Sequence, residues 1–142
     1  MKRERGSAVC VHEGKLLTVL LRDPVTHTAR LFVPGGAIEA GETPAEAAMR
    51  ETFEETGYRV ACLARAPVIA RYPFTWAGTA VDVTTHFFAA ALCDSAVAAA
   101  PVSDASYNEG VCWISLADVP EQLGFDMNIL EAVQQLLPDQ KR

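Results

Sequence analysis

Short runs of apolar residues, separated by glycine and proline, predict a sheet interrupted by two helices. Residues 7–23 are expected to form a hairpin, because Val- and Leu-rich runs flank a Glu13–Gly14 turn. Residues 24–29 are a predicted loop. Residues 30–36 are a short predicted strand broken by Pro34, after which Gly35 and Gly36 release the backbone from the usual φ limits. This break is a candidate functional turn.

A helix of about 13 residues follows, with well-marked ends. Thr43 lies three residues before Glu46, as in a capping box, and Pro44 occupies the first helical position. Gly57 supplies a left-handed stop at the other end.

The second half of the chain also consists of predicted strands separated by turns and loops, followed by a helix. Residues 58–74 and 79–94 are β-rich and predict a long hairpin. Residues 95–110 are a predicted loop, residues 111–116 a strand, residues 117–122 a short turn and residues 125–137 an amphipathic helix. The expected order β-β-β-α-β-β-β-α is an α/β/α sandwich with a mixed sheet. We expect one domain over residues 1–142.

Charge and composition narrow the function. The formal net charge of −6 disfavours binding to nucleic-acid polymers or anionic membranes. The four cysteines, interpreted as buried thiols, and the three scattered histidines form no zinc pattern. The apolar run near the N-terminus is too short for a signal peptide or a membrane span. A cytoplasmic protein is the expectation.

The first predicted helix carries an acidic edge. At about 100° per residue, Glu51, Glu54 and Glu55 fall together beside an apolar arc, and Arg50 can pair with Glu46 or Glu54. Clustered carboxylates repel one another unless something neutralises them. Mg²⁺ suits them, because it prefers oxygen ligands and usually combines one or two carboxylates with phosphate and water. A solvated helix face is the alternative explanation.

The spacing of the residues around this helix favours the metal site. Gly36 lies six residues before Glu42, Glu42 lies eight before Arg50, and the segment ends in R-E-T-F-E-E-T-G-Y. This pattern resembles the box of the Nudix hydrolase family. The matching positions are Gly36, Glu42, Arg50, Glu51, Glu54, Glu55 and Gly57, and the departures are Thr52 and Tyr58, where aliphatic residues are usual.

The resemblance implies a hydrolase that cleaves the diphosphate linkage of a nucleoside diphosphate joined to another group X, using Mg²⁺ or Mn²⁺. Glu51, Glu54 and Glu55 would then be catalytic metal ligands, and a backbone carbonyl of Gly35 or Gly36 would complete the coordination. Arg50 would orient a glutamate. Glu42 would brace the loop or join the outer metal shell.

Further candidates come from the same resemblance. Glu109 stands where many Nudix proteins carry an extra catalytic or metal-binding acid, although an ordinary loop glutamate explains it equally well. Arg22 and Arg30 are candidates for phosphate contacts.

Three aromatic residues, Tyr72, Phe74 and Trp76, are candidates for stacking on a nucleobase. A core or hairpin-tip role explains them as easily. The partner is expected to be a nucleotide-type small molecule, bound by a monomer or homodimer. The alternative function is a Nudix-fold nucleotide-sensing module with little or no catalysis, but such a module would be expected to lose box carboxylates, and this chain keeps them all.

Overall fold

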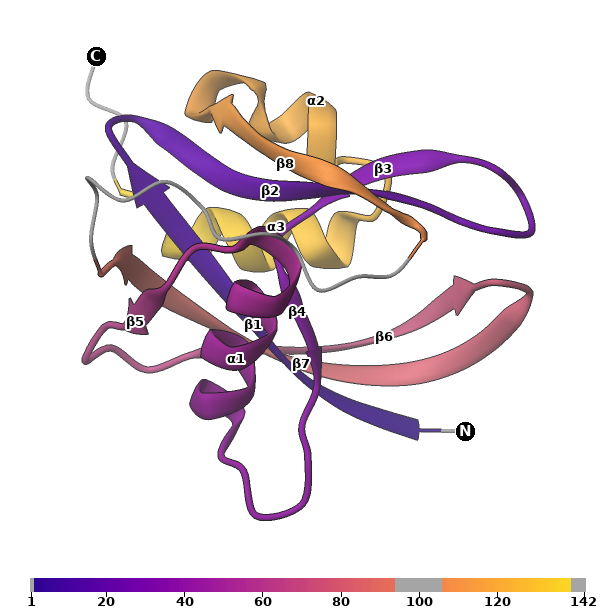
Figure 1. The fold of residues 1–142 in the computed structure, drawn as a ribbon, viewed down its shortest axis with the longest axis horizontal. Helices are drawn as coiled ribbons and strands as arrows, with labels where there is room; N and C mark the ends of the chain where they lie inside the picture. The colour runs from indigo at the N-terminus through magenta and orange to yellow at the C-terminus, as the bar shows by residue number, and fades with distance from the viewer. Residues whose placement is uncertain (1, 94–105, 139–142) are drawn as a thin grey trace.

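The computed structural model describes residues 2–93 and 106–138 (Figure 1). The elements in chain order are β1 (Lys2–His12), β2 (Lys15–Arg22), β3 (Ala29–Phe32), β4 (Gly35–Ala37), α1 (Pro44–Thr56), β5 (Val60–Cys62), β6 (Val68–Trp76), β7 (Thr79–Leu92), β8 (Asn108–Ser115), the 3₁₀ turn η1 (Leu116–Asp118), α2 (Val119–Leu123) and α3 (Met127–Leu136).

The sheet is mixed, as predicted. Its main path runs β3-β2-β1-β7-β5, and β4 pairs with β1, β6 with β7 and β8 with β2. The β1 and β7 strands are parallel, whereas the other pairs are antiparallel. Helix α1 packs on β1 and β4, and α3 packs on β6 and β7 from the other side (Figure 1). The α/β fold predicted from the sequence is therefore confirmed.

Several element limits differ from the prediction. The first hairpin turns at Glu13 and Gly14, which both have positive φ, but β1 already begins at Lys2. The predicted run 58–74 is split between β5 and β6, and residues 117–122 are mainly helical rather than a simple turn. Most of the predicted loop 95–110 lies outside the described residues, and its last part, residues 108–110, belongs to β8.

The predicted glycine turn after Pro34 is wrong. Gly35 and Gly36 lie in β4 and pair with Ser7 and Gly6 of β1, and neither is among the described residues with positive φ. A side chain on either residue would collide with its neighbours. These positions therefore need glycine because other groups approach closely, and not because the chain reverses there.

The core has a large part around α3 and a smaller part beneath α1. Two threonines of α1 are fully buried, and each donates its hydroxyl to the carbonyl four residues earlier: Thr52 to Ala48 at 2.7 Å and Thr56 to Thr52 at 2.6 Å. Because these hydroxyls are satisfied within the helix, Thr52 fits where an aliphatic residue is usual.

The sequence suggested that all four cysteines are buried, but the structure shows that they are not. Cys10 is buried and Cys62 partly so, but Cys93 and Cys112 are exposed. Cys112 faces outward because side chains alternate along β8. Among the helices of the described residues, none is long and apolar enough to cross a membrane.

Asp23 joins two loops that are distant in sequence. Its carboxylate accepts hydrogen bonds from the N–H groups of Val25 at 2.8 Å and Thr26 at 3.2 Å, in the loop after β2. It also accepts one from Ala77 at 3.0 Å, in the turn between β6 and β7. These bonds, led by the one from Val25, lower the pKa of Asp23. The carboxylate thus holds the β6–β7 turn against the β2–β3 loop.

Replacing Asp23 with alanine is expected to lower the melting temperature by about 5 °C, because three backbone donors lose their acceptor. Asp82→Ala is the matched control, since Asp82 is exposed on β7. Thermal unfolding followed by circular dichroism measures both variants. Equal shifts in the two would show that the Asp23 bridge contributes no special stability.

Candidate functional site

Helix α1 starts and stops where the sequence predicts. The Thr43 hydroxyl accepts from the Glu46 N–H at 3.1 Å, and the Glu46 carboxylate accepts from the Thr43 N–H at 2.9 Å. Gly57 ends the helix with a φ of 80°. These caps fix which turn of the helix faces β4.

Two glycines let α1 approach the sheet closely. A Cβ on Gly6 would lie 2.3 Å from the carbonyl oxygen of Pro44, and one on Gly36 would lie 2.3 Å from the carboxyl carbon of Glu51. The Glu51 side chain therefore lies directly against the β4 backbone.

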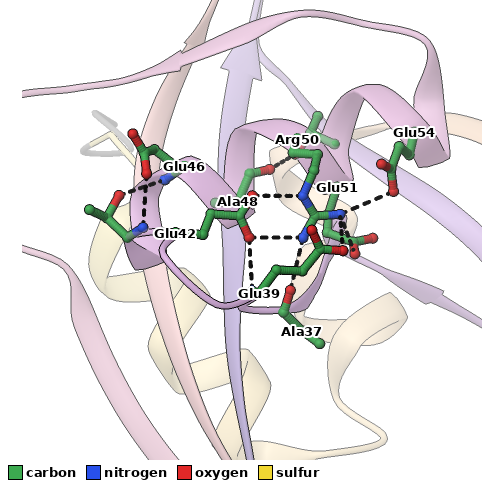
Figure 2. Close-up of polar contacts among 10 residues, drawn as sticks. Ala37, Glu39, Glu42, Glu46, Ala48, Arg50, Glu51 and Glu54 are labelled. Atoms are coloured by element: carbon green, nitrogen blue, oxygen red, sulfur yellow. Dashed lines mark hydrogen bonds and ion pairs between the residues drawn. The ribbon is translucent and has the colours of Figure 1, made fainter.

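Arg50 organises the acidic residues (Figure 2). Its guanidinium donates to Glu42 at 2.7 Å, to Glu51 at 3.0 Å and to Glu54 at 3.2 Å. A further bond reaches the Ala37 carbonyl oxygen at 2.9 Å, which ties α1 to the end of β4. The pairing predicted with Glu54 is present.

Glu46 is not a partner of Arg50, because its carboxylate is used in the cap at the start of the helix. Glu42 takes the position opposite Arg50 instead. Hydrogen bonding to Arg50 lowers the pKa of Glu42 to about 2, so this carboxylate stays charged at neutral pH. The contact supports the predicted bracing role of Glu42.

Glu51 and Glu55 line one end of a cavity of about 280 Å³. Burial is the main reason that the pKa of each is raised, to about 8 for Glu55, and the negative charge of Glu51 adds to the shift at Glu55. One opposing contact is the Gly35 N–H, which donates to Glu55 at 3.2 Å. These two carboxylates are thus desolvated and close together, without enough positive charge to compensate them.

Glu54 is placed differently from its two neighbours. Its side chain is 43% exposed, against 19% for Glu51, and it is not part of the cavity wall. It remains linked to Glu51 through their shared partner, the Arg50 guanidinium. The predicted acidic edge therefore divides into an inward pair and one outward carboxylate.

The inward pair suits a hard divalent cation. Within the described part of the chain, no three His, Cys, Asp or Glu side chains form a ready metal cluster. Two carboxylates are nevertheless a usual protein contribution to a Mg²⁺ site, with substrate phosphate and water as the other ligands. Gly35 and Gly36, predicted as carbonyl ligands, line the same end of the cavity.

The rest of the cavity wall is aliphatic on one strand and aromatic on the next. Val81 and Val83 come from β7, and Phe74 and Trp76 come from β6. Tyr107 and Phe32 complete the aromatic end, where Trp76 meets Tyr107 edge to face with ring centroids 5.7 Å apart. Two of the three aromatic residues singled out from the sequence are therefore in the cavity.

Tyr72 is not in this cavity. It is 5% exposed within the core, and its hydroxyl lies 2.9 Å from that of Thr85. Because side chains alternate along β6, Tyr72 shares its face with Phe74 and Trp76 but lies deeper in the sheet.

Arg22, Arg30 and Glu109 are also outside the cavity wall. Arg22 and Glu109 pair with each other at 2.6 Å, and Arg30 lies over the Phe125 ring, 5.2 Å from its centroid. Asn108, the neighbour of Glu109, contacts the helix directly: its side-chain amide donates to the Glu55 carbonyl oxygen at 3.0 Å. Asn108 thus fixes the end of α1 to β8.

Sequence reasoning missed Arg3 and Arg5, which both line the cavity. They are two positions apart on β1, so their side chains project from the same face of the strand. The first strand predicted from the sequence began at residue 7. Extending that strand back to the N-terminus would have placed the side chains of Arg3 and Arg5 on one face.

Comparison with known proteins identifies the family. The family model of the NUDIX domain matches residues 2–135. A putative 8-oxo-dGTP diphosphatase of Bacillus subtilis is 34% identical over 88 residues, which cover 62% of this chain and 52% of that protein. Diphosphoinositol polyphosphate phosphohydrolase 3-beta of Bos taurus is 37% identical over 57 residues, which cover 40% of this chain and 35% of that protein.

The chain thus spans about half the length of the first relative and about a third of the second. A NUDIX hydrolase structure from Nitrosomonas europaea superposes with a TM-score of 0.66 at 22% identity, covering 95% of this chain and 90% of that one. This likeness shows a shared fold. Since the family model covers nearly all of the sequence, the chain belongs to the Nudix family of hydrolases.

Proposed function

We propose that this protein is a divalent-cation-dependent hydrolase that cleaves the diphosphate linkage of a nucleoside diphosphate joined to another group X. The observation that carries the proposal is the desolvated pair Glu51 and Glu55 at one end of a cavity whose other end is aromatic. The first end suits a cation with its phosphates, and the second suits a flat ring.

Each box residue has a role in this proposal. Glu51 and Glu55 hold Mg²⁺ or Mn²⁺, together with a backbone carbonyl of Gly35 or Gly36. The bound cation supplies positive charge next to the diphosphate oxygens, which lets a protein of net charge −6 accept an anionic substrate. Arg50 holds Glu51 in place and keeps Glu54 beside it.

Water activation falls to the glutamates of α1. Glu54 is the most exposed of the three and is held by one charged hydrogen bond from Arg50, so it retains acceptor capacity for a water molecule. Glu109 is bound to Arg22 through both of its carboxylate oxygens. That pairing favours a bracing role for Glu109 over a catalytic one.

The substrate class remains as broad as the sequence predicts: nucleoside triphosphates, ADP-ribose or nucleotide sugars. The two curated relatives, by name, act on a modified nucleoside triphosphate and on a diphosphoinositol polyphosphate. Both names support a phosphoric anhydride substrate. A sensing module without catalysis is disfavoured, because all the box carboxylates are present. We place the protein in the cytoplasm, as a monomer or homodimer.

With Mg²⁺, the purified protein is expected to hydrolyse at least one member of a panel of nucleoside triphosphates, dinucleoside polyphosphates, ADP-ribose and nucleotide sugars. Glu51→Gln and Glu55→Gln are each expected to lower kcat at least about 100-fold, because loss of even an outer metal partner costs about 10- to 100-fold. Chromatography of the products gives the rates and the bond cleaved.

Glu131→Gln, on the exposed face of α3, removes the same charge and is expected to leave the rate unchanged. EDTA is expected to stop the reaction. Full activity in both cavity variants, or in EDTA, would refute the metal assignment.

Two glycine-to-alanine substitutions are expected to distinguish an effect on cation binding from an effect on folding stability. The atoms nearest to a Cβ on Gly36 belong to the carboxylate of Glu51, which can swing aside, whereas Gly6→Ala meets the backbone of Pro44. Gly36→Ala is therefore expected to keep its melting temperature within a few degrees and to weaken cation binding at least about tenfold. Gly6→Ala is expected to lower stability by about 1–3 kcal/mol. Thermal melts and Mn²⁺ titrations measure the pair, and normal cation affinity in Gly36→Ala would contradict this arrangement.

A further inference from the structure

The floor of the cavity has a fixed chemical order. In the half of the sheet beneath it, β4 pairs with β1, β1 with β7 and β7 with β6 (Figure 1). Each strand contributes mainly one kind of residue to the cavity. These residues are Gly35 and Gly36 from β4, Arg3 and Arg5 from β1, Val81 and Val83 from β7, and Phe74 and Trp76 from β6. Neighbouring strands lie about 4.8 Å apart, so the order extends over about 14 Å.

Among the residues that the structure describes, the two arginines in this series form no ion pair with a carboxylate. Arg22 and Arg50 each make short ion pairs. By contrast, in residues 2–93 and 106–138 no ion pair within 4.0 Å involves Arg3 or Arg5. Arg5 is partly buried and lines the cavity. Its guanidinium hydrogen-bonds the Tyr72 side chain, and because a guanidinium has five N–H donors, others remain for a ligand in these partly dehydrated surroundings. Such a group binds phosphate oxygens well.

Arg5 also lies within electrostatic reach of the acidic end. Its positive charge favours the ionised forms of Glu51 and Glu55, which lowers their pKa values against the effect of burial. It forms no ion pair with either of them. A phosphate on Arg5 would therefore lie next to the carboxylates and the cation that they hold, as one of the two phosphates of the diphosphate linkage.

The valines and the aromatic residues continue the series. Val81 and Val83 offer an apolar surface next to the arginines. Beyond them, Phe32 meets Phe74 and Trp76 edge to face, with ring centroids 6.0 and 6.1 Å away. The wall thus changes from cationic to apolar to aromatic, as a nucleotide changes from phosphate to sugar to base.

We propose that Arg5, assisted by Arg3, binds the phosphate that carries the nucleoside, so that the nucleoside monophosphate half of the substrate lies toward Trp76 and the X group lies toward α1. This assignment rests on the proposed function and adds the direction in which the substrate lies. It makes Arg5 a substrate-binding residue, and it distinguishes the two halves of a substrate that contains two phosphates.

Binding of substrate fragments without metal tests this orientation independently of turnover. The chain has two tryptophans, so a Trp113→Phe background leaves Trp76 as the fluorescent reporter. The probes, titrated in EDTA, are the four ribonucleoside 5′-monophosphates, their nucleosides and ribose 5-phosphate. The best-bound monophosphate is expected to bind at least about tenfold more tightly than its nucleoside or ribose 5-phosphate, because it alone reaches both ends of the series.

Variants of Arg5 locate the phosphate. Arg5→Gln is expected to reduce the affinity for the monophosphate to that of the nucleoside and to leave the nucleoside affinity unchanged. Arg5→Lys, which keeps the charge, is expected to restore part of the loss. Arg71→Gln, an exposed site on β6, removes the same charge and is expected to change neither affinity.

Three results would overturn the orientation: no monophosphate binding up to millimolar concentration, unchanged monophosphate affinity in Arg5→Gln, or an equal loss for monophosphate and nucleoside. The substrate panel separates this proposal from the hydrolase proposal. Turnover with a KM that is unaffected by Arg5→Gln would refute the orientation alone. Arg5-dependent binding without turnover of any panel member would refute the hydrolase alone.

Discussion

The burial of two neighbouring carboxylates is the constraint on which the site depends. Glu51 and Glu55 are brought against β4 because Gly6 lets the backbone of α1 approach β1 closely and Gly36 leaves room for the Glu51 carboxylate. This approach removes water from both carboxylates and places them near each other, which raises their pKa values. A folded protein keeps such an arrangement at a cost in stability. In the hydrolase that we propose, a bound divalent cation would offset that cost.

The surrounding contacts keep this strained arrangement in place. Arg50 ties Glu42, Glu51 and Glu54 together and also reaches the end of β4, so hydrogen bonds from one side chain connect the loop, the helix and the strand. Asn108 holds the far end of α1 from β8. At the opposite side of the cavity, Asp23 holds the turn that follows Trp76. The acidic and aromatic ends are thus each fixed by hydrogen bonds between segments that are distant in sequence.

The local features of this site could be predicted from the sequence, whereas its long-range features could not. Caps, helix periodicity and the Nudix box are encoded over a few turns of one helix, so the ends of α1 and the Arg50–Glu54 pair followed from spacing alone. Tyr72, Arg22 and Arg30, candidates from the sequence, lie outside the cavity wall. Strand pairing decides which faces meet, and no short segment specifies that pairing. Arg3 and Arg5 were missed for the same reason: they matter only because β1 lies between β4 and β7.

The most direct test of the central claim is calorimetric titration of the metal-free protein with Mn²⁺ at pH 7 in two buffers of different ionisation heat. The pKa of Glu55 is about 8, set by burial and by Glu51 against the Gly35 N–H and Arg5, so most molecules carry a proton there at pH 7. Binding is predicted to release close to one proton, less as the pH rises through 8, and none in Glu55→Gln. Mn²⁺ binding that is equally tight in Glu55→Gln and releases no proton from the wild-type protein would contradict the account.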